Sequence, residues 1–326
     1  MVHKLPNNVS VHYWVWTLRY AYTDDACVEG RSTSISGIGT TNSPPHSPMY
    51  DVTSEIALLN RDESRSWQDV SPTLFAVLKE AHDVSELTGG SFDVTVAPML
   101  ELWSHKPDSS GVLGQMAFQP PTTDQLEQVR GSVGYARLEL RSVPRQSVRK
   151  SASGMRLAVD GIAPGYAVDR IATELRALGH ANFIVEIGGE VRAAGQRSEG
   201  GPWRIAIEAP LATRREPLVG LRLRDAAVST SGDYRDARID ADGHRYSHTI
   251  DPRTGRTTSS ALTAVTVIDA NAIRADAYAT ALMVMGTEDG LAWAQAQRVP
   301  ALFVERTAQP GEWRVVESPA FAEWRE

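Results

Sequence analysis

The sequence predicts an α+β fold with antiparallel sheets. Residues 71–87, the segment after Gly165 and residues 272–285 have the periodicity of helices. Strand-like segments lie between these helices, and two of them flank a predicted hairpin turn at Asp242-Gly243. Helices and strands do not alternate regularly along the chain, so a doubly wound parallel sheet is less favoured than a mixed arrangement.

The helix at 71–87 has the clearest boundaries. Ser71 can cap its N-terminus, Pro72 suits its first helical position, and Gly89-Gly90 follows its end. Its apolar stripe comprises Leu74, Val77, Leu78, Ala81 and Val84. The second helix is predicted to follow Gly165 and to close at Gly179. The third is predicted for 272–285, with a stop at Gly286.

The remaining pattern divides the chain into a short N-terminal part and one main domain. Strands are predicted at 11–22, 183–187, 203–209, 218–223 and 262–268, with a hairpin formed by 234–239 and 245–250. Residues 30–48 are rich in Ser, Thr, Gly and Pro without periodicity, which predicts a loop. We therefore expect an N-terminal strand and loop over residues 1–49 and a main domain over residues 50–326.

Composition and charge exclude several classes of function. The chain has 326 residues and a net charge of -7 without a concentrated basic face, so we expect no nucleic-acid partner. Cys27 is the only cysteine, which excludes an internal disulfide and a CxxC motif. No apolar run reaches the roughly 18 residues of a membrane span. Met1–Ser10 lacks a secretory pattern, and we expect a cytoplasmic protein from the sequence as written.

Asp276 and Thr280 are the first candidates for a metal site. They lie four residues apart in the third predicted helix, so both oxygen-bearing side chains share one helix face. Hard oxygen ligands of this kind suit Mg²⁺, which takes few protein ligands alongside phosphate oxygens and water. Each residue also has a simpler interpretation, because an aspartate can favour a helix start and a threonine can bond to the carbonyl four residues earlier.

A glycine turn precedes the second predicted helix. The segment Asp160-Gly161-Ile162-Ala163-Pro164-Gly165 opens that helix, and we expect its free N–H groups to face an anion. The same glycines also suit an ordinary turn. The later hairpin does not fit a calcium loop, because counting from Asp240 puts Arg245 where glycine is required and Asp251 where a bidentate Glu is required.

Taken together, these segments resemble the ApbE family, the FAD:protein FMN transferases. The resemblance covers about Tyr50 to Gly290. It rests on Ser54-Glu55-Ile56 with Leu59-Asn60 and on six further segments, GSFDVTVAP at 90–98, GIAPGYAVD at 161–169, EIGGEVRAAG at 186–195, STSGDYR at 229–235, HTIDPRTG at 248–255 and ADAYATAL at 275–282. Any one segment alone is a weak signal, whereas all of them in this order are specific.

The resemblance implies a flavin cleft between packed helices and antiparallel sheets, with particular residues in it. The implied flavin contacts are Tyr50, Ser91, Phe92, Asp93 and Ile250. The implied Mg²⁺ ligands are the carbonyl of Gly161 and the side chains of Asp276 and Thr280. His248 matches a histidine typical of the family and is placed near the pyrophosphate.

The implied reaction is Mg²⁺-dependent phosphoryl transfer from FAD. FMN would pass to a Thr or Ser of an acceptor flavoprotein and AMP would leave; either a carboxylate or His248 would take the proton. Two alternatives remain: a Mg²⁺-dependent FAD pyrophosphatase that uses water, and a flavin-binding relative without turnover.

The chain departs from the family pattern in three places. The changes at 15–17, Ala158 and Pro164 favour the non-catalytic alternative, whereas the intact Asp276 and Thr280 oppose it. Val15-Trp16-Thr17 stands where the family has Met-Gly-Thr, and the loop at 30–48 stands where a helix is expected. Ala158 and Pro164 replace the usual acid and the usual Lys or Glu. Asp160, two residues after Ala158, compensates for the acid if the segment is a strand, since both side chains would then share a face.

Overall fold

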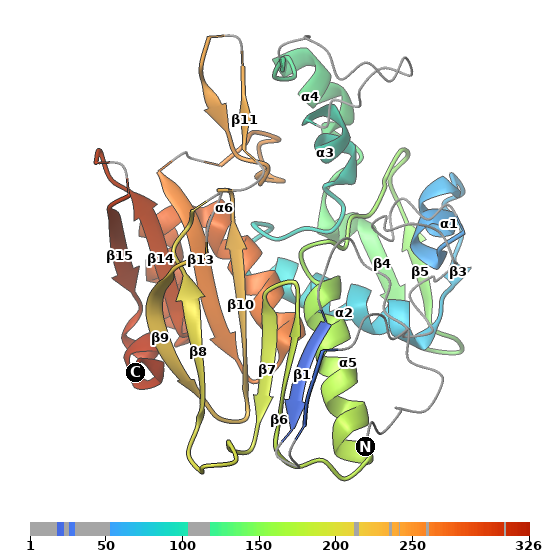
Figure 1. Ribbon diagram of the computed structural model, residues 1–326. Coiled ribbons are helices and arrows are strands. Elements are labelled where there is room, and N and C mark those ends of the chain that lie inside the picture. The colour runs from blue at the N-terminus through green and yellow to red at the C-terminus, as the bar shows by residue number, and fades with distance from the viewer. Residues whose placement is uncertain are drawn as a thin grey trace.

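An eight-stranded antiparallel sheet organises the molecule (Figure 1). The computed structural model describes residues 53–103, 118–211, 215–234, 237–240, 242–258, 261–309 and 311–326, and the backbone of 18–22 and 26–29. The strand order is β15-β14-β13-β10-β7-β6-β1-β2. The strands are β1 (Leu18–Tyr22), β2 (Ala26–Glu29), β6 (Phe183–Ile187), β7 (Glu190–Ala194), β10 (Ala226–Gly232), β13 (Leu262–Asp269), β14 (Ala301–Arg306) and β15 (Trp313–Glu317).

The two faces of this sheet carry different layers. Helices α5 (Ala163–Ala177) and α6 (Ala272–Gln297) pack on one face through an apolar cluster that includes Val168, Phe183 and Ala227. The hairpin β8 (Trp203–Glu208) and β9 (Pro217–Leu223) covers the other face, together with the 3₁₀ turn η2 (Pro319–Trp324). Because side chains alternate along a strand, neighbouring residues of one strand serve different layers.

A second group of elements packs against α6 on the helix side of the sheet. It contains α1 (Glu55–Arg61), α2 (Pro72–Leu87), α3 (Ala97–Trp103), α4 (Thr123–Arg130) and the 3₁₀ turn η1 (Tyr135–Arg137). It also contains a three-stranded sheet of order β3-β5-β4, formed by β3 (Gln68–Asp69), β5 (Ser147–Lys150) and β4 (Leu138–Arg141). One apolar cluster joins α2, this small sheet and α6. The mixture of helices and antiparallel sheets confirms the predicted α+β class.

The predicted helix boundaries are right at α2 and partly wrong elsewhere. Ser71 caps α2 by accepting a hydrogen bond from the Leu74 N–H at 3.1 Å, and Pro72 is its first residue. Helix α5 begins at Ala163 instead of after Gly165, because Pro164 in its first turn needs no hydrogen bond to its nitrogen. In α6 the backbone breaks at Gly286, as predicted, and a further helical stretch continues to Gln297.

The predicted hairpin exists but is short. Its strands are β11 (Arg238–Ile239) and β12 (Arg245–Tyr246), far shorter than the predicted 234–239 and 245–250. The turn between them is held by Asp240, whose carboxylate accepts hydrogen bonds from the N–H groups of Asp242 (3.0 Å) and His244 (2.8 Å). Residues 249–251 pair with the segment that follows them, because the Thr249 carbonyl accepts from the Thr258 N–H (3.0 Å) and the Asp251 N–H donates to the Arg256 carbonyl (2.8 Å), so the second predicted strand does not continue along the first.

Several sequence predictions lie outside the described residues. These are residues 11–17 of the first predicted strand, the loop at 30–48 and Tyr50. The domain boundary at residue 49 stays a prediction. Within the part of the chain that the structure describes, no helix combines the length and the apolar character needed to cross a membrane.

Candidate active site

Gly161, Asp276 and Thr280 lie together where α5 begins beside α6. A Cβ atom placed on Gly161 would lie 2.9 Å from Thr280 Oγ1, so the two residues touch across the helix pair. The Thr280 hydroxyl is within hydrogen-bond distance of Ser231 Oγ on β10, at 3.1 Å. Gly161 and Thr280 lie far apart in the sequence, and the packing of α5 against α6 brings them together.

Asp276 is a buried carboxylate at this junction, with 5% of its surface exposed. Its Oδ2 accepts a hydrogen bond of 3.0 Å from the Gly165 N–H. Burial raises the pKa of Asp276 to about 7, the Gly165 N–H opposes this shift, and the Asp160 carboxylate adds to it. The charged form of Asp276 is therefore unfavourable, and either a proton or a bound cation would neutralise it.

This contact corrects the prediction that the glycine turn offers free N–H groups to an external anion. The anion that meets the Gly165 N–H is the side chain of Asp276. The Ile162 and Ala163 N–H groups donate to the carbonyl of Val159. The start of α5 thus orients a metal-ligand candidate.

Gly165 is required by the closeness of the two helices. A Cβ atom on Gly165 would lie 2.3 Å from the carbonyl oxygen of Ala272, far inside van der Waals contact. The first turn of α6 is also capped from α5, because the Asp169 carboxylate accepts hydrogen bonds of 3.0 Å from the N–H groups of Ala272 and Ile273. These contacts fix Asp276 relative to Gly161.

The segment that carries Asp160 and Gly161 is held by Asn60. Its side chain donates to the Leu157 carbonyl (2.9 Å) and accepts from the Leu157 N–H (2.7 Å). Residues 157–159 are not a strand, so the argument that Asp160 shares a face with Ala158 does not apply. Asp160 is exposed, and its charge acts on Asp276, which places it at the same site.

The loop after α2 places Phe92 beside the same point. Phe92 Cε2 would lie 3.5 Å from a Cβ on Gly161. The Asp93 carboxylate accepts hydrogen bonds from the Thr95 N–H, the Thr95 hydroxyl and the Tyr135 N–H, at 2.7 to 2.8 Å. Burial raises the pKa of Asp93, which these bonds oppose. Ser91 Oγ is buried without a hydrogen-bond partner among the described residues, so it is the polar atom of this loop that remains for a ligand.

The segment after β12 carries the other predicted residues. Ile250 is buried against Met99 and Val133, and His248 is exposed. The following turn is closed by Asp251, whose carbonyl accepts the Gly255 N–H at 2.7 Å. Ile250 thus packs against helix α3. The placement of His248 near a pyrophosphate stays a prediction.

Three polar residues of the site were not predicted individually. Glu190 on β7 and Ser229 and Ser231 on β10 face α6. Ser229 Oγ donates to Glu190 Oε1 at 3.3 Å, and Ser231 reaches Thr280. Burial, and then the charge of Asp276, raise the pKa of Glu190 well above its usual range. The spacing of two between the serines is the sequence signal that both share one face of a strand.

The oxygen atoms at this junction fit a divalent cation. The donor set of a carboxylate, a hydroxyl and a backbone carbonyl is hard, as Mg²⁺ requires. The charged groups that act on Asp276 and Glu190 are themselves carboxylates, and burying such groups together is costly unless a cation joins them. Gly161, Asp276 and Thr280 are therefore suitable ligands.

A second acidic group lies at the tip of the β11–β12 hairpin. Ligand atoms of Asp240, Asp242 and His244 lie within 4.8 Å of one another. The Asp240 carboxylate already accepts from the hairpin backbone and from the Tyr246 hydroxyl at 3.0 Å. These contacts account for the cluster as a turn, in agreement with the rejection of a calcium loop.

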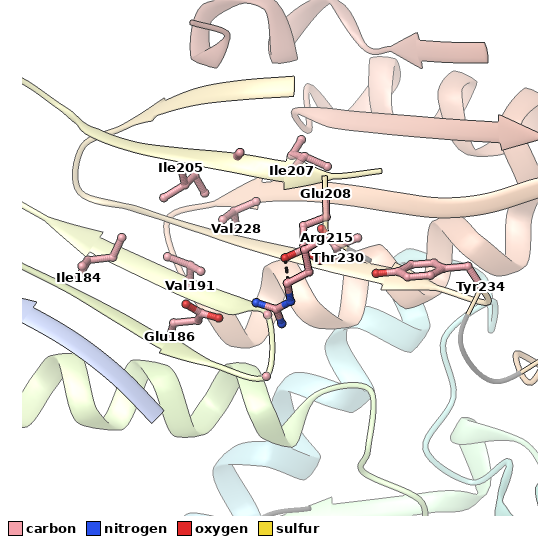
Figure 2. A pocket seen from close by; sticks show the side chains of 13 residues that line it. Ile184, Glu186, Val191, Ile205, Ile207, Glu208, Arg215, Val228, Thr230 and Tyr234 are labelled. Carbon is pink, nitrogen blue, oxygen red and sulfur yellow. Dashed lines mark ion pairs between the residues drawn. The ribbon is translucent and has the colours of Figure 1, made fainter. Parts of the chain in front are cut away.

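A cavity of about 290 Å³ lies on the opposite face of the main sheet (Figure 2). Side chains of β6, β7 and β10 face β8 across it, and Glu208 and Arg215 form an ion pair of 3.3 Å at its side. Its apolar lining comprises Ile184, Val191, Ile205, Ile207 and Val228. None of the predicted site residues that the structure describes lines this cavity, so it is separate from the junction of α5 and α6.

Comparisons with known proteins identify the family of this chain. The chain is 38% identical to the FAD:protein FMN transferase of Vibrio cholerae over 258 residues, 79% of this chain and 74% of that protein. It is 32% identical to the Haemophilus influenzae protein of the same name over 263 residues, 79% and 73% of the two chains.

Solved structures lead to the same family. The flavin transferase ApbE from Vibrio cholerae superposes with a TM-score of 0.72 at 36% identity, covering 85% of this chain and 84% of that chain. The ApbE protein of Thermotoga maritima superposes with a TM-score of 0.72 at 28% identity, covering 85% of each. The model of the ApbE family matches residues 46–303, and the chain belongs to the ApbE family.

Proposed function

We propose that this protein transfers FMN from FAD to a Thr or Ser hydroxyl of an acceptor flavoprotein in a Mg²⁺-dependent reaction. The observation that carries the proposal is the meeting of Gly161, Asp276 and Thr280, whose carbonyl, buried carboxylate and hydroxyl are hard oxygen donors. Relatives named FAD:protein FMN transferase support the same chemistry.

The reaction breaks the phosphoanhydride bond of FAD and forms a phosphoester bond to the acceptor. The acceptor hydroxyl oxygen attacks the phosphorus on the FMN side of the pyrophosphate, the bond to the AMP oxygen breaks, and the hydroxyl proton leaves. Bound Mg²⁺ would neutralise charge on the pyrophosphate oxygens. Asp276 is committed to the cation in this scheme, which leaves His248 as our candidate for accepting the proton, since histidines exchange protons near neutral pH.

Other residues of the chain would hold the flavin end of FAD. Phe92 lies beside Gly161, and the buried Ser91 hydroxyl supplies a hydrogen-bonding group for the flavin. We infer that Asp93 orders this loop through Thr95 and Tyr135 more than it contacts the ligand through its carboxylate. Tyr50 and Ile250 remain proposed flavin contacts. Pro164, a departure from the family, fits the first turn of α5 without loss of a hydrogen bond.

The test is incubation of the protein with FAD, Mg²⁺ and candidate apo-acceptor flavoproteins, followed by intact-protein mass spectrometry and AMP quantification. We expect one acceptor to become heavier by one FMN, with AMP formed in equal amount. An acceptor whose target Thr or Ser is replaced by Ala or Val, and a reaction with EDTA, are the controls.

Two other outcomes would replace the proposal. AMP and free FMN without an adduct on any acceptor would identify a pyrophosphatase. FAD retained at one equivalent without AMP would identify a flavin-binding protein, with Ala158 and the Val15-Trp16-Thr17 segment as the changed positions. The cytoplasmic location also stays a prediction, which fractionation of native cells would test.

A further inference from the structure

Glu190 is a buried acid at the candidate site that the proposed ligand set does not use. It begins β7 directly after the Gly188-Gly189 turn, and 6% of its surface is exposed. Its Oε1 accepts a hydrogen bond from Ser229 Oγ at 3.3 Å. Its Oε2 is inaccessible to solvent and has no hydrogen-bond partner within the described part of the chain.

The charges around Glu190 do not compensate for its burial. Asp276 and Glu186 are the charged groups that act on it, and both are acids. The neighbouring cation on β7, Arg192, instead makes an ion pair with Asp169 of α5, the residue that caps the first turn of α6. A buried carboxylate with an unused oxygen beside a second buried carboxylate requires either a proton or a cation.

Strand β10 contacts both Glu190 and the proposed cation ligand Thr280. Ser229 binds Glu190 and Ser231 binds Thr280, and these serines lie two residues apart on the face directed toward α6. One strand therefore positions Glu190 and a proposed cation ligand relative to each other. Such hydrogen bonds are typical of residues that orient ligands around a metal.

We propose that Glu190 is a further ligand of the cation held by Gly161, Asp276 and Thr280, through its Oε2 atom. This inference rests on the cation site of the proposed function. Two carboxylates around one divalent ion give a neutral site, which removes the repulsion between Glu190 and Asp276.

Metal binding by Glu190→Gln, measured without FAD and without an acceptor, tests this inference. The substitution keeps the shape of the side chain and removes its charge. Mn²⁺ binding is followed by electron paramagnetic resonance, and Mg²⁺ binding by competition with Mn²⁺. We expect the affinity of Glu190→Gln for both ions to fall roughly tenfold or more. Glu190→Asp, which retains the charge on a shorter side chain, should give an intermediate affinity.

Thermal unfolding distinguishes a role of Glu190 as a metal ligand from a purely structural role. If Glu190 is a ligand, the metal-free Tm of Glu190→Gln will not fall, because repulsion with Asp276 is relieved, and the rise in Tm on adding Mg²⁺ will shrink. A lower metal-free Tm with wild-type Mn²⁺ affinity would overturn the inference and make Glu190 a structural partner of Ser229. Absence of metal binding by the wild-type protein would overturn it too.

Glu186→Gln is the matched control. Glu186 lies four residues away across the Gly188-Gly189 turn and lines the cavity on the other face of the sheet. Its charge acts on Glu190 less than that of Asp276 does, so its loss should change metal affinity far less than Glu190→Gln. Normal metal binding by the wild-type protein, weakened in Glu190→Gln, together with no FMN transfer to any acceptor, would support this inference while contradicting the proposed function.

Discussion

The two faces of strands β7 and β10 differ sharply although they are built from alternating residues of the same segments. On the helix face, Glu190, Ser229 and Ser231 meet Asp276 and Thr280 of α6. On the other face, Val191, Val228 and Thr230 line a cavity under the β8–β9 hairpin. Figure 2 shows this second face from close by.

The two faces differ in whether their charged groups are paired with opposite charges. Acids on the helix face are buried against one another, whereas on the cavity face Glu208 is paired with Arg215 at 3.3 Å. A pair of opposite charges near solvent is already neutralised, but a group of buried acids requires either protons or a bound cation. We therefore place the proposed reactive site on the helix face, where the burial of acids is uncompensated, and not at the cavity.

The largest expected effect is the loss of FAD cleavage in Asp276→Asn. Removal of a cation ligand should cost several kcal/mol in the reaction barrier, or roughly a 1,000-fold loss of rate. AMP release from FAD is the measurement, with circular dichroism to show that the variant is folded. Glu186→Gln on the cavity face is the control and should retain the wild-type rate. Wild-type AMP release by a folded Asp276→Asn protein would remove the distinction between the faces.

A smaller effect is expected on stability from Gly165→Ala. The added methyl group would lie 2.3 Å from the Ala272 carbonyl oxygen, and the helices cannot separate without losing contacts, so we expect a loss of about 3 kcal/mol in the free energy of unfolding. Urea denaturation measures this loss.

Gly220→Ala in β9 is the matched substitution on the other side of the sheet. Its new methyl group would meet the flexible side chain of Glu326 at 3.0 Å, which can move. We expect a change of about 0.5 kcal/mol or less. Equal losses in the two variants would show that the helix junction is not more tightly packed than the β8–β9 layer.

The smallest effect on activity or stability is expected from replacing Ser231 or Thr230, adjacent residues of β10 whose side chains lie on opposite faces of the sheet. Ser231→Ala removes the hydroxyl next to Thr280 and should weaken Mg²⁺ binding and FAD cleavage roughly tenfold. Thr230→Ala removes a 2.7 Å contact with Thr266 and should lower stability by about 0.5 kcal/mol while leaving Mg²⁺ binding unchanged. Mg²⁺ titrations of both variants measure the difference, and equal affinities would argue that Ser231 does not support the site.

Local features were predictable from the sequence where the partners lie close along the chain. Ser71 and Pro72 set the start of α2 through contacts within one helical turn, and these were predicted correctly. Asp276 and Thr280 share a helix face because of their spacing. The resemblance to the ApbE family placed Gly161 with them, a proximity that periodicity alone does not give.

Features that depend on distant partners were missed. The Gly165 N–H was expected to face an external anion, but its acceptor is Asp276, 111 positions further along the chain. Glu190 received no role because its environment arises only when β7 and β10 pair and α6 covers them. The hairpin was predicted too long because residues 249–251 pair with residues 256–258 instead of with the first strand.

The most direct test of the cation site is a crystal structure of the protein soaked with Mn²⁺, with anomalous data collected to locate the ion. We expect an anomalous peak bound by the Gly161 carbonyl, an Asp276 carboxylate oxygen and Thr280 Oγ1. A peak at the exposed Asp240, Asp242 and His244 cluster with none at the α5–α6 junction would contradict it.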